Sequence, residues 1–426
     1  MIRRAVTPRP NWQSKLERLG FDYHSLEGSY WQESACYEFT AAQIDIIEEA
    51  TTTLHQMCLS AVDFIITNDR FAQLGISDSA AALIEQSWQR RDPCVYGRFD
   101  LVYHPIHTPT PKLLEYNADT PTSLFEASVA QWYWLQDNFP QADQFNSIHE
   151  RLIGQWRIID ETLSRRVSSS SNYQARPVSL VKPVKASSPT KITFATITDS
   201  IEDVVTCRYL QDTAIQAGLE TQFMDLRKIG VMEEDGKVAQ FVDLADSPIG
   251  ALFKLYPWEW LIQEAFSAYL ADSHTQWLEP MWKSLLSNKG ILPILWELNP
   301  NHPNLLPSYF AAERTKLTQL TPTQIAHGII QKPLFSREGA NITLLNTDFS
   351  PTGLMTSGEY GNVSSTQMVY QAMQPLPQFM NHANRPVYPV IGSWVIGHSA
   401  AGIGIREDDS LITKDTSHFV PHYFVP

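Results

Sequence analysis

Four polar residues that could act together on a phosphate-bearing substrate interrupt two short apolar segments near residue 100. Arg98 and Asp100 alternate with apolar residues in the first segment, and Glu115 and Asn117 end the second. Such alternation places both residues of each pair on one face of a β-strand, so a hairpin would gather all four side chains. Carboxylate and amide oxygens are ligands that Mg²⁺ accepts. An arginine beside the ion suits a site where negative charge develops during acyl or phosphoryl transfer.

The segment that follows this pattern has the features of a helix start. In A-D-T-P-T-S-L-F-E, Thr122 or Ser123 can cap a helix, and Glu126 stands three residues after Ser123, the spacing of a capping box. A helix N-terminus beside a metal patch would form a seat for an anion. The spacing alone is equally compatible with a solvated hairpin face that carries an Arg–Asp pair.

Composition excludes several classes of protein. The 426 residues can bury a large core and predict one enzyme-sized unit with two or three subdomains. The net charge of −14 argues against a general nucleic-acid binder but would tolerate a cationic partner such as a polyamine. The four cysteines form no C-x-x-C pair, so neither a zinc site nor a disulfide framework is predicted. The chain shows no secretory signal and no apolar run of about 18 residues, which predicts a cytoplasmic protein without a membrane partner. No heptad pattern indicates an oligomeric state.

Hydrophobic periodicity predicts the main elements. Helices are expected over residues 40–67, 78–90, 124–137 and 145–167. After a Ser- and Pro-rich run, a strand at 192–198, a helix at 201–217 and a strand at 221–225 are typical of a parallel sheet. The predicted organisation is an N-terminal part (1–170) with the hairpin (96–126), a linker or surface loop (171–190), a substrate subdomain (191–270) and a nucleotide-binding part (271–426), all in one unit.

An acidic run, D-S-I-E-D, begins the helix predicted at residues 201–217. Substrates of open α/β sheets bind beyond the carboxyl ends of strands, where this run lies. Acidic residues in a first turn also complement the helix dipole, and the pattern favours that simpler explanation.

The C-terminal third holds further candidates for phosphate binding. Lys332 ends a predicted strand at 328–333, and the loop S-R-E-G-A-N separates it from another strand. Such a loop can fold its N–H groups over phosphates, although it is neither a Walker A motif nor a Rossmann fingerprint. Lys289 precedes an apolar segment, a pattern typical of a surface lysine. Arg406 ends a glycine-spaced strand and could bind a phosphate or pair with the acidic residues beside it.

Longer motifs carry a resemblance to a known family. They are R-F-D at 98–100, L-E-Y-N-A-D-T-P-T-S at 114–123, L-F-K-L-Y-P-W-E at 252–259, W-K-S-L-L-S-N-K at 282–289, K-P-L-F-S-R-E-G-A-N at 332–341 and G-I-G-I-R-E-D at 402–408. The chain thereby resembles the glutathionylspermidine synthase family, specifically its ATP-grasp synthetase part, and most closely the short bacterial branch of acid–amine ligases. The resemblance runs nearly end to end. It implies a mixed α/β fold, namely a circularly permuted ATP-grasp fold with a pre-ATP-grasp substrate subdomain.

The resemblance also implies an activity and residue roles. The activity is that of an ATP- and Mg²⁺-dependent ligase that joins a peptide-like carboxylate to an amine through an acyl-phosphate. Catalysis would rest on Arg98 and Arg406, and Mg²⁺ on Asp100, Glu115 and Asn117. ATP would be bound by Lys289, Lys332, Ser336, Glu338, Gly339 and, beside adenine, Gln371. Substrate contacts would come from Thr120 and, on the amine, Glu202.

The chain departs from the family in one respect. Bifunctional members carry an N-terminal Cys–His amidase domain, and the segment before Arg98 is too short to hold one, so hydrolase activity is not expected. The family's glutathione and spermidine contacts match poorly, and that substrate pair is not carried over. Two alternatives stay open: a ligase that modifies a peptide or protein terminus, and a catalytically silent nucleotide-binding partner protein. The intact R-F-D and E-Y-N motifs argue against the silent protein.

Overall fold

The computed structural model describes the chain except for residues 27, 29, 172–190, 235–236, 359–363 and 415. Among the described residues, the strands form one sheet of six strands and further sheets of five, four, three and two. The fold is therefore mixed α/β, as predicted. The linker predicted at 171–190 lies almost wholly outside the described residues.

The central six-stranded sheet contains the predicted hairpin. Strands β3 (Tyr96–His104) and β4 (Thr108–Asn117) pair antiparallel, and β17 lies on the other side of β3. The order is β19-β18-β17-β3-β4, with β16 paired to β17. The later strands are β16 (Phe379–Met380), β17 (Pro386–Ile396), β18 (Ser399–Asp408) and β19 (His418–Val420). Strands from the end of the chain thus complete a sheet that the hairpin begins.

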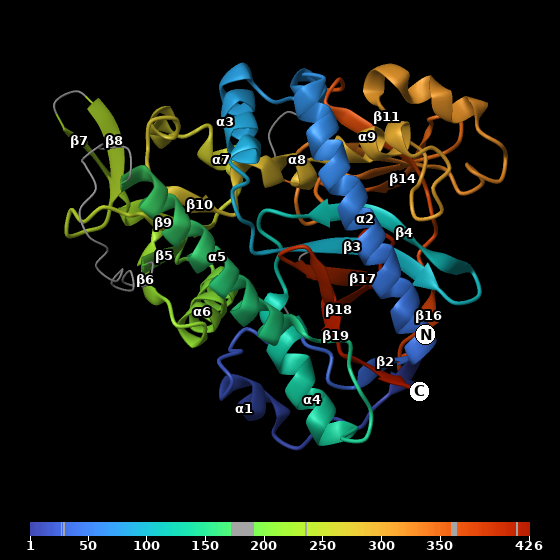
Figure 1. Cartoon of the computed structure of the whole chain (residues 1–426). Coiled ribbons are helices and arrows are strands. Elements are labelled where there is room, and N and C mark those ends of the chain that lie inside the picture. The colour runs from blue at the N-terminus through green and yellow to red at the C-terminus, as the bar shows by residue number, and fades with distance from the viewer. Residues whose placement is uncertain (27, 29, 172–190, 235–236, 359–363, 415) are drawn as a thin grey trace.

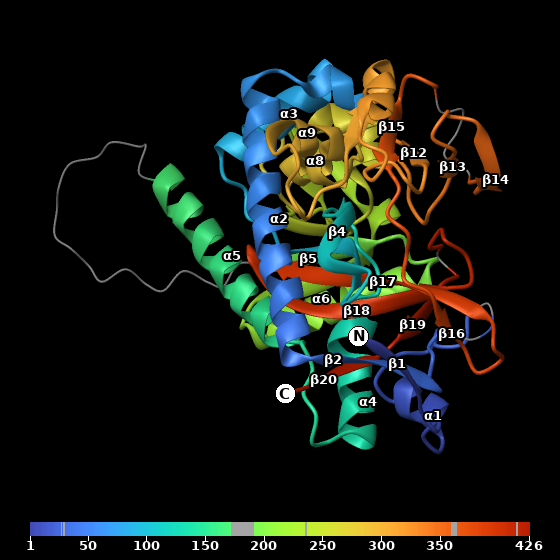
Figure 2. The ribbon, with the colours of Figure 1, turned by 90° about the vertical axis from the view of Figure 1, so that its right-hand side faces the viewer.

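Helices cover both faces of this sheet (Figures 1 and 2). The long helix α2 (Ala41–Thr67) lies across one face, where Phe99 and Leu101 of β3 share its apolar core. Helix α5 (Ile148–Ser171) lies on the other, with the π-helical turn Glu126–Ala130 and α4 (Gln131–Asn138). The helix predicted at 40–67 is confirmed, and Thr40 closes its first turn in a capping box with Gln43.

The predicted strand–helix–strand unit forms part of a parallel sheet. Its order is β10-β9-β5-β6, and every pairing in it is parallel. The elements are β5 (Lys191–Thr196), α6 (Ile201–Gln216), β6 (Glu220–Asp225), β9 (Ala251–Leu255) and β10 (Gln276–Leu278). A two-stranded ribbon, β7 (Gly230–Glu234) and β8 (Lys237–Val242), extends from it.

The five-stranded sheet is antiparallel and carries the predicted phosphate-covering loop between two neighbouring strands. Its order is β11-β15-β12-β13-β14. The strands are β11 (Ser308–Phe310), β12 (Ile329–Pro333), β13 (Thr343–Leu345), β14 (Pro351–Met355) and β15 (Met368–Ala372). The loop between β12 and β13 leaves this sheet towards the central hairpin.

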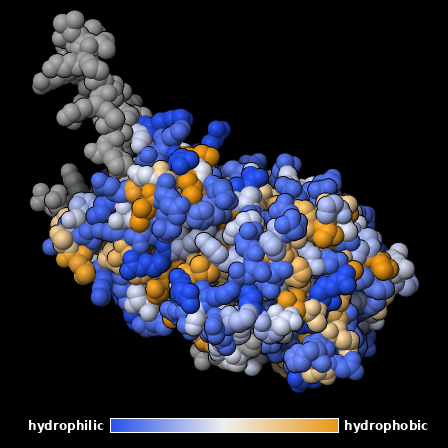
Figure 3. Space-filling model, turned by 90° about the horizontal axis from the view of Figure 1, so that it is seen from below, coloured by the Kyte–Doolittle hydropathy of each residue, from blue (hydrophilic) through white to orange (hydrophobic). Residues whose placement is uncertain are grey.

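The remaining elements join the sheets. The first and last strands of the chain share a three-stranded sheet: β1 (Ile2–Ala5), β2 (Ala35–Thr40) and β20 (His422–Val425). The other α-helices are α1 (Trp12–Glu17), α3 (Asp78–Gln89), α7 (Trp258–Leu261), α8 (Ser284–Ser287) and α9 (Ile291–Leu298). Short 3-10 turns span Phe71–Leu74, Leu226–Lys228, Ala265–Tyr269, Met281–Lys283 and Ala311–Gln319. Figure 3 shows a mainly hydrophilic face with scattered apolar residues.

Sheet pairing crosses the division of the chain predicted from sequence. Strand β10 follows residue 270 but belongs to the parallel sheet, and β17 and β18 belong with the hairpin and not with the five-stranded sheet. The predicted boundaries between domains therefore stay a prediction. Hydrogen bonds between strands join segments that are far apart in the sequence. No helix in the described part of the chain has the length and hydropathy needed to cross a bilayer.

Candidate active site

The register of the hairpin places the four polar residues on one patch. Arg98 lies opposite Asn117, and Asp100 lies opposite Glu115. Phe99 and Leu101 point to the α2 side of the sheet, which leaves the polar residues on the side of the cavity. Strand β17 contributes Gly392 opposite Asp100, where an added Cβ would lie 2.7 Å from Cδ of Arg98. The glycine therefore makes room for the arginine stem, a requirement that sequence reasoning missed.

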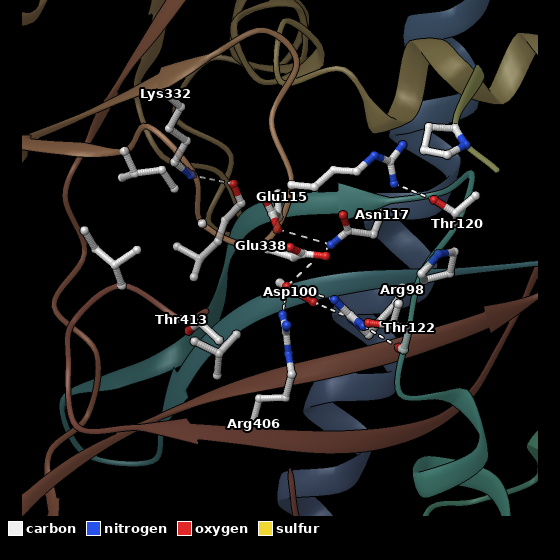
Figure 4. A pocket seen from close by; sticks show the side chains of 18 of the residues that line it. Arg98, Asp100, Glu115, Asn117, Thr120, Thr122, Lys332, Glu338, Arg406 and Thr413 are labelled. Carbon is white, nitrogen blue, oxygen red and sulfur yellow. Dashed lines mark hydrogen bonds and ion pairs between the residues drawn. The ribbon is translucent and has the colours of Figure 1, made fainter. Parts of the chain in front are cut away.

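Two arginines from different strands converge on Asp100 (Figure 4). Arg98 Nε donates to Asp100 Oδ1 at 2.7 Å, and Arg406 Nη2 donates to Asp100 Oδ2 at 2.6 Å. Arg98 Nη1 also donates to the carbonyl oxygen of Thr122 at 2.6 Å. Arg406 pairs with Asp100, whereas the neighbouring Glu407 binds Arg3. The guanidinium groups are thus held in fixed orientations beside the carboxylates.

Two lysines flank Glu115. Lys289 Nζ lies 3.1 Å from Glu115 Oε2 and donates to the carbonyl oxygen of Ser336 at 2.7 Å. Burial would raise the pKa of Glu115, but Lys289 and Lys332 outweigh it and hold that pKa well below its usual range. Burial lowers the pKa of Lys332 to about 8, partly opposed by Glu115. Lys289 is buried and not the surface lysine that its pattern indicated.

Lys332 is oriented by neighbours from two sheets. Its Nζ donates to the carbonyl oxygen of Leu114 and to Gln371 Oε1, each at 2.9 Å. Gln371 Nε2 donates in turn to the carbonyl oxygen of Leu113 at 3.3 Å. The structure therefore places Gln371 as a buried support for Lys332, while its predicted contact with adenine stays a prediction.

The loop predicted to cover phosphates lies against the hairpin and the parallel sheet. Arg337 donates from Nε to Glu259 Oε1 at 2.8 Å and from Nη1 to Thr120 Oγ1. Gly339 has φ +69°, and a Cβ there would lie 2.4 Å from the carbonyl oxygen of Thr413. Only a glycine fits this approach and this backbone conformation. Arg337 was not singled out from sequence, although it stands inside the loop motif.

These segments enclose a cavity of about 200 Å³. Most of the predicted site residues line it: Arg98, Asp100, Glu115, Asn117, Thr120, Lys332, Glu338, Gly339 and Arg406. Figure 4 shows the side chains of these residues, Gly339 apart, around the cavity. The other four do not line it: Glu202, Lys289, Ser336 and Gln371. We call Arg98, Asp100, Glu115, Lys332 and Arg406 the phosphate-side group.

A second set of charged residues, Glu126, Glu202 and Asp203, forms what we call the acidic group. Asp203 lines the cavity, one residue beyond the predicted Glu202. Burial, with Glu126 and Asp203 nearby, raises the pKa of Glu202 to about 8. Burial also raises the pKa of Asp203 to about 6. The side chain of Ser200 caps α6, and Glu202 and Asp203 lie in its first turn. Neither acidic residue is therefore the N-cap.

Glu126 is fully buried, and its contacts differ from those predicted from the sequence. The predicted capping box with Ser123 is wrong, because Glu126 Oε1 accepts hydrogen bonds from Tyr30 at 2.7 Å and Tyr23 at 3.0 Å. Its Oε2 has no hydrogen-bond partner among the described residues. Burial raises the pKa of Glu126, which favours its protonated form. The tyrosines come from a segment near the N-terminus, and no local pattern predicts that contact.

The donor set fits Mg²⁺. Asp100, Glu115 and Asn117 present two carboxylates and one amide, and Asn117 Nδ2 donates to Asp100 Oδ2 at 3.5 Å and to Glu115 Oε1 at 3.2 Å, which holds the three side chains together. Among the described residues, no three His, Cys, Asp or Glu side chains are arranged as a metal site by themselves. Mg²⁺ commonly binds through one or two carboxylates and completes its shell with water and substrate phosphates. The hairpin offers that arrangement and not a closed protein cage.

The fold is that of glutathione synthetase-like ATP-grasp proteins. The chain shares its fold with a glutathione synthetase-like effector of Globodera pallida, with a TM-score of 0.52 at 10% identity over 92% of this chain and 89% of the other. The model of the family "Glutathionylspermidine synthase preATP-grasp" matches residues 3–425, and the chain belongs to this family. The family resemblance seen in the sequence motifs is confirmed.

Relatives are ligases or synthetases. A candidate acid–amine ligase of Haemophilus influenzae is 38% identical over 98% of both chains. Trypanothione synthetase of Crithidia fasciculata is 27% identical over 96% of this chain and 57% of its own length. The bifunctional glutathionylspermidine synthetase/amidase of Escherichia coli is 24% identical over 96% of this chain and 63% of its own length. This protein is therefore a ligase of the same family, and it spans little more than half the length of the latter two.

Proposed function

We propose that the protein is an ATP-dependent acid–amine ligase that forms an amide through an acyl-phosphate. The observation that carries the proposal is that the phosphate-side group and Asp203 of the acidic group line one cavity, with Glu202 next to Asp203. Cations that face a transferring phosphoryl group and carboxylates that face an amine are what the two half-reactions need.

The phosphate-side group would serve the first half-reaction. A substrate carboxylate would attack the terminal phosphorus of ATP, and the bond from that phosphorus to the leaving ADP oxygen would break. Lys332, supported by Gln371, would hold the phosphates, and Arg98 would stabilise the charge on the moving group. Mg²⁺ bound by Asp100, Glu115 and Asn117 would supply charge neutralisation and in-line orientation.

The acidic group would serve the second half-reaction. Asp203 at the cavity, with Glu202 behind it, would attract the amine as its cation. The attacking nitrogen would first lose a proton to solvent or to an ionised carboxylate of the acidic group. The neutral nitrogen would then attack the acyl carbon, the bond from that carbon to the phosphate oxygen would break, and the remaining extra proton on nitrogen would leave with phosphate or solvent. Arg98 would stabilise the oxyanion of the tetrahedral intermediate. Leu255, Pro257 and Trp260 line the same cavity and would contact the apolar stem of the amine. Thr120, held by Arg337, lies where it could contact either substrate.

The test is phosphate release with ATP and Mg²⁺ over a panel of carboxylates, each with and without an amine. Peptide-like acids and polyamines come first, since trypanothione and glutathionylspermidine are products named for relatives. Hydroxylamine added in place of the amine would trap an acyl-phosphate as a hydroxamate. Release that requires both substrates supports the proposal. A folded protein that binds neither ATP nor Mg²⁺ contradicts it and favours the silent partner protein.

The same assay distinguishes a ligase for small amines from a ligase that modifies a peptide or protein terminus. A ligase for a peptide or protein terminus would release phosphate with a carboxyl-terminal peptide or a protein substrate and would ignore small amines.

A further inference from the structure

A fully buried ion pair lies behind the cavity. Lys254 and Asp119 each have side chains that are 0% exposed, and Lys254 Nζ donates to Asp119 Oδ1 at 2.8 Å. The ammonium also donates to the carbonyl oxygen of Tyr256 at 2.9 Å and lies 4.3 Å from the centre of the Trp258 ring. Burial lowers the pKa of Lys254, and Asp119 opposes that shift. Neither residue lines the cavity.

The pair joins two segments that do line the cavity. Asp119 stands beside Thr120 and between Asn117 and Thr122, whose carbonyl oxygen holds Arg98. Lys254 lies in β9, next to Leu255, which lines the cavity. The turn after β9 supplies two more residues of that side of the cavity, Pro257 and Trp260.

Further hydrogen bonds hold the side chain of Asp119 and the backbone around it. Asp119 Oδ2 accepts the backbone N–H of Trp258 at 2.8 Å, which fixes the start of α7. Ser287 Oγ accepts the backbone N–H groups of Ala118 at 3.0 Å and Asp119 at 2.9 Å. One side chain therefore sets the relative position of the hairpin's exit loop and the turn that follows β9.

Stability alone is a weak reason for such a pair. Moving both charges out of water is costly, and apolar residues of similar size often stabilise a core as well or better. The pair instead fixes the relative position of the two segments that carry it, because its hydrogen bonds are directional. Catalysis by positioning is sensitive to displacements of about 1 Å, which can cost on the order of 100-fold in rate.

The chain contains a matched pair elsewhere. Lys283 and Glu279 are 2% and 0% exposed, with 2.7 Å between Nζ and Oε2. Glu279 Oε1 accepts the backbone N–H groups of Val95 at 2.9 Å and Tyr96 at 2.8 Å. This pair has the same chemistry and burial, and it too binds backbone, but the residues that it holds, Val95 and Tyr96 at the start of β3, do not themselves line the cavity.

We propose that Lys254 and Asp119 are positioning residues that clamp loop 118–122 against turn 255–260. The clamp would align Arg98 with the side of the cavity that Leu255, Pro257 and Trp260 form. The catalytic consequence rests on the proposed ligase function, whereas the clamp itself is a property of the free protein. The two are therefore tested separately.

The clamp is tested by amide hydrogen exchange of the free protein in wild type, Lys254→Met, Asp119→Asn and the control Lys283→Met. Asp119→Asn keeps size and one acceptor oxygen, so it supplies the test if Lys254→Met fails to fold. We expect exchange to accelerate at least tenfold in both 118–124 and 256–261 of the first two variants, with protection in the five-stranded sheet unchanged. The control should accelerate exchange near residues 93–97 instead. Unchanged exchange in these segments, or a uniform change over the whole chain, overturns the clamp.

The catalytic role is tested by kinetics on the same variants. We expect the KM for ATP to stay within about threefold, while kcat/KM for the carboxylate falls by about 10- to 100-fold. The folded control should retain wild-type values. An equal loss in Lys283→Met would assign the effect to stability and overturn positioning. If the wild type itself shows no ligase activity, the proposed function fails, and hydrogen exchange still decides the clamp.

Discussion

The phosphate-side group lines the cavity and the acidic group reaches it through Asp203, but the two groups have opposite electrostatics. In the first, each carboxylate is matched by cations, so the pKa of Glu115 lies well below its usual range. In the second, buried carboxylates lie near one another, and the pKa values rise to about 8 for Glu202 and about 6 for Asp203. The first group pairs its carboxylates with cations before any ligand binds, whereas in the second group burial outweighs the nearby Arg98 and Arg337. Under the proposed function, the first group would stabilise developing negative charge and the second would attract a cationic amine.

The largest effect should come from removing the preorganised arginine. We expect Arg98→Ala to lower kcat by about 100- to 1000-fold, because the charge of the transferring phosphoryl group would lose a buried, fixed donor. Steady-state phosphate release measures it. Arg3→Ala is the matched control, since Arg3 also forms a buried pair, with Glu407 at 2.7 Å, but lies outside the cavity. Similar losses in both variants would contradict the special role of Arg98.

The next effect concerns the metal. Asp100→Asn and Glu115→Gln should raise the Mg²⁺ concentration for half-maximal activity by about 10- to 100-fold, because each removes one charged oxygen ligand. A Mg²⁺ titration at saturating ATP measures the shift. An unchanged Mg²⁺ requirement would place the ion elsewhere.

The acidic group should control the amine and not the nucleotide. We expect Asp203→Asn to raise the KM for the amine by about tenfold while the KM for ATP stays the same, because one attraction to a cation is lost. For the wild type, kcat/KM for the amine should rise as pH increases through about 8, where Glu202 ionises. Glu202→Gln should show a smaller rise, because only deprotonation of the amine itself then contributes. An identical pH profile in both proteins would exclude Glu202 as the titrating group.

The smallest effect is on stability. The folded-state pKa of Glu202 lies above its ordinary value, so its contribution to stability is complete below that ordinary pKa and is lost as pH rises through about 8. Glu202→Gln cannot ionise, and its Tm relative to wild type should therefore increase from pH 5 to pH 9. Thermal unfolding across this range measures the difference. A constant Tm difference would mean that Glu202 is not buried with like charges.

Much of the hairpin was predictable because β-strands have a period of two. Arg98 and Asp100 had to share one face, and so did Glu115 and Asn117 once the segments were strands. The N-terminal end of α2 was also predictable, because the capping partners Thr40 and Gln43 are three residues apart. The residue roles at the site came from family motifs, and they remain predictions that the experiments above address.

Other features depended on contacts between distant segments. Glu126 has the spacing of a capping residue, yet two tyrosines near residue 30 bind it. Asp203 lines the cavity in place of its neighbour Glu202, because the direction of a side chain on α6 depends on how that helix packs. Arg337 lies in the covering loop, but its partner Glu259 is far away in sequence.

The sequence by itself determined the local periodicities, the family and the patch of polar residues on the hairpin, because these depend on residues a few positions apart. Only the tertiary structure decided that β17 completes the hairpin sheet, that Gly392 admits Arg98 and that Lys254 meets Asp119. Those contacts arise when apolar faces pack and distant polar groups must find partners away from water. No local pattern specifies which partners they find.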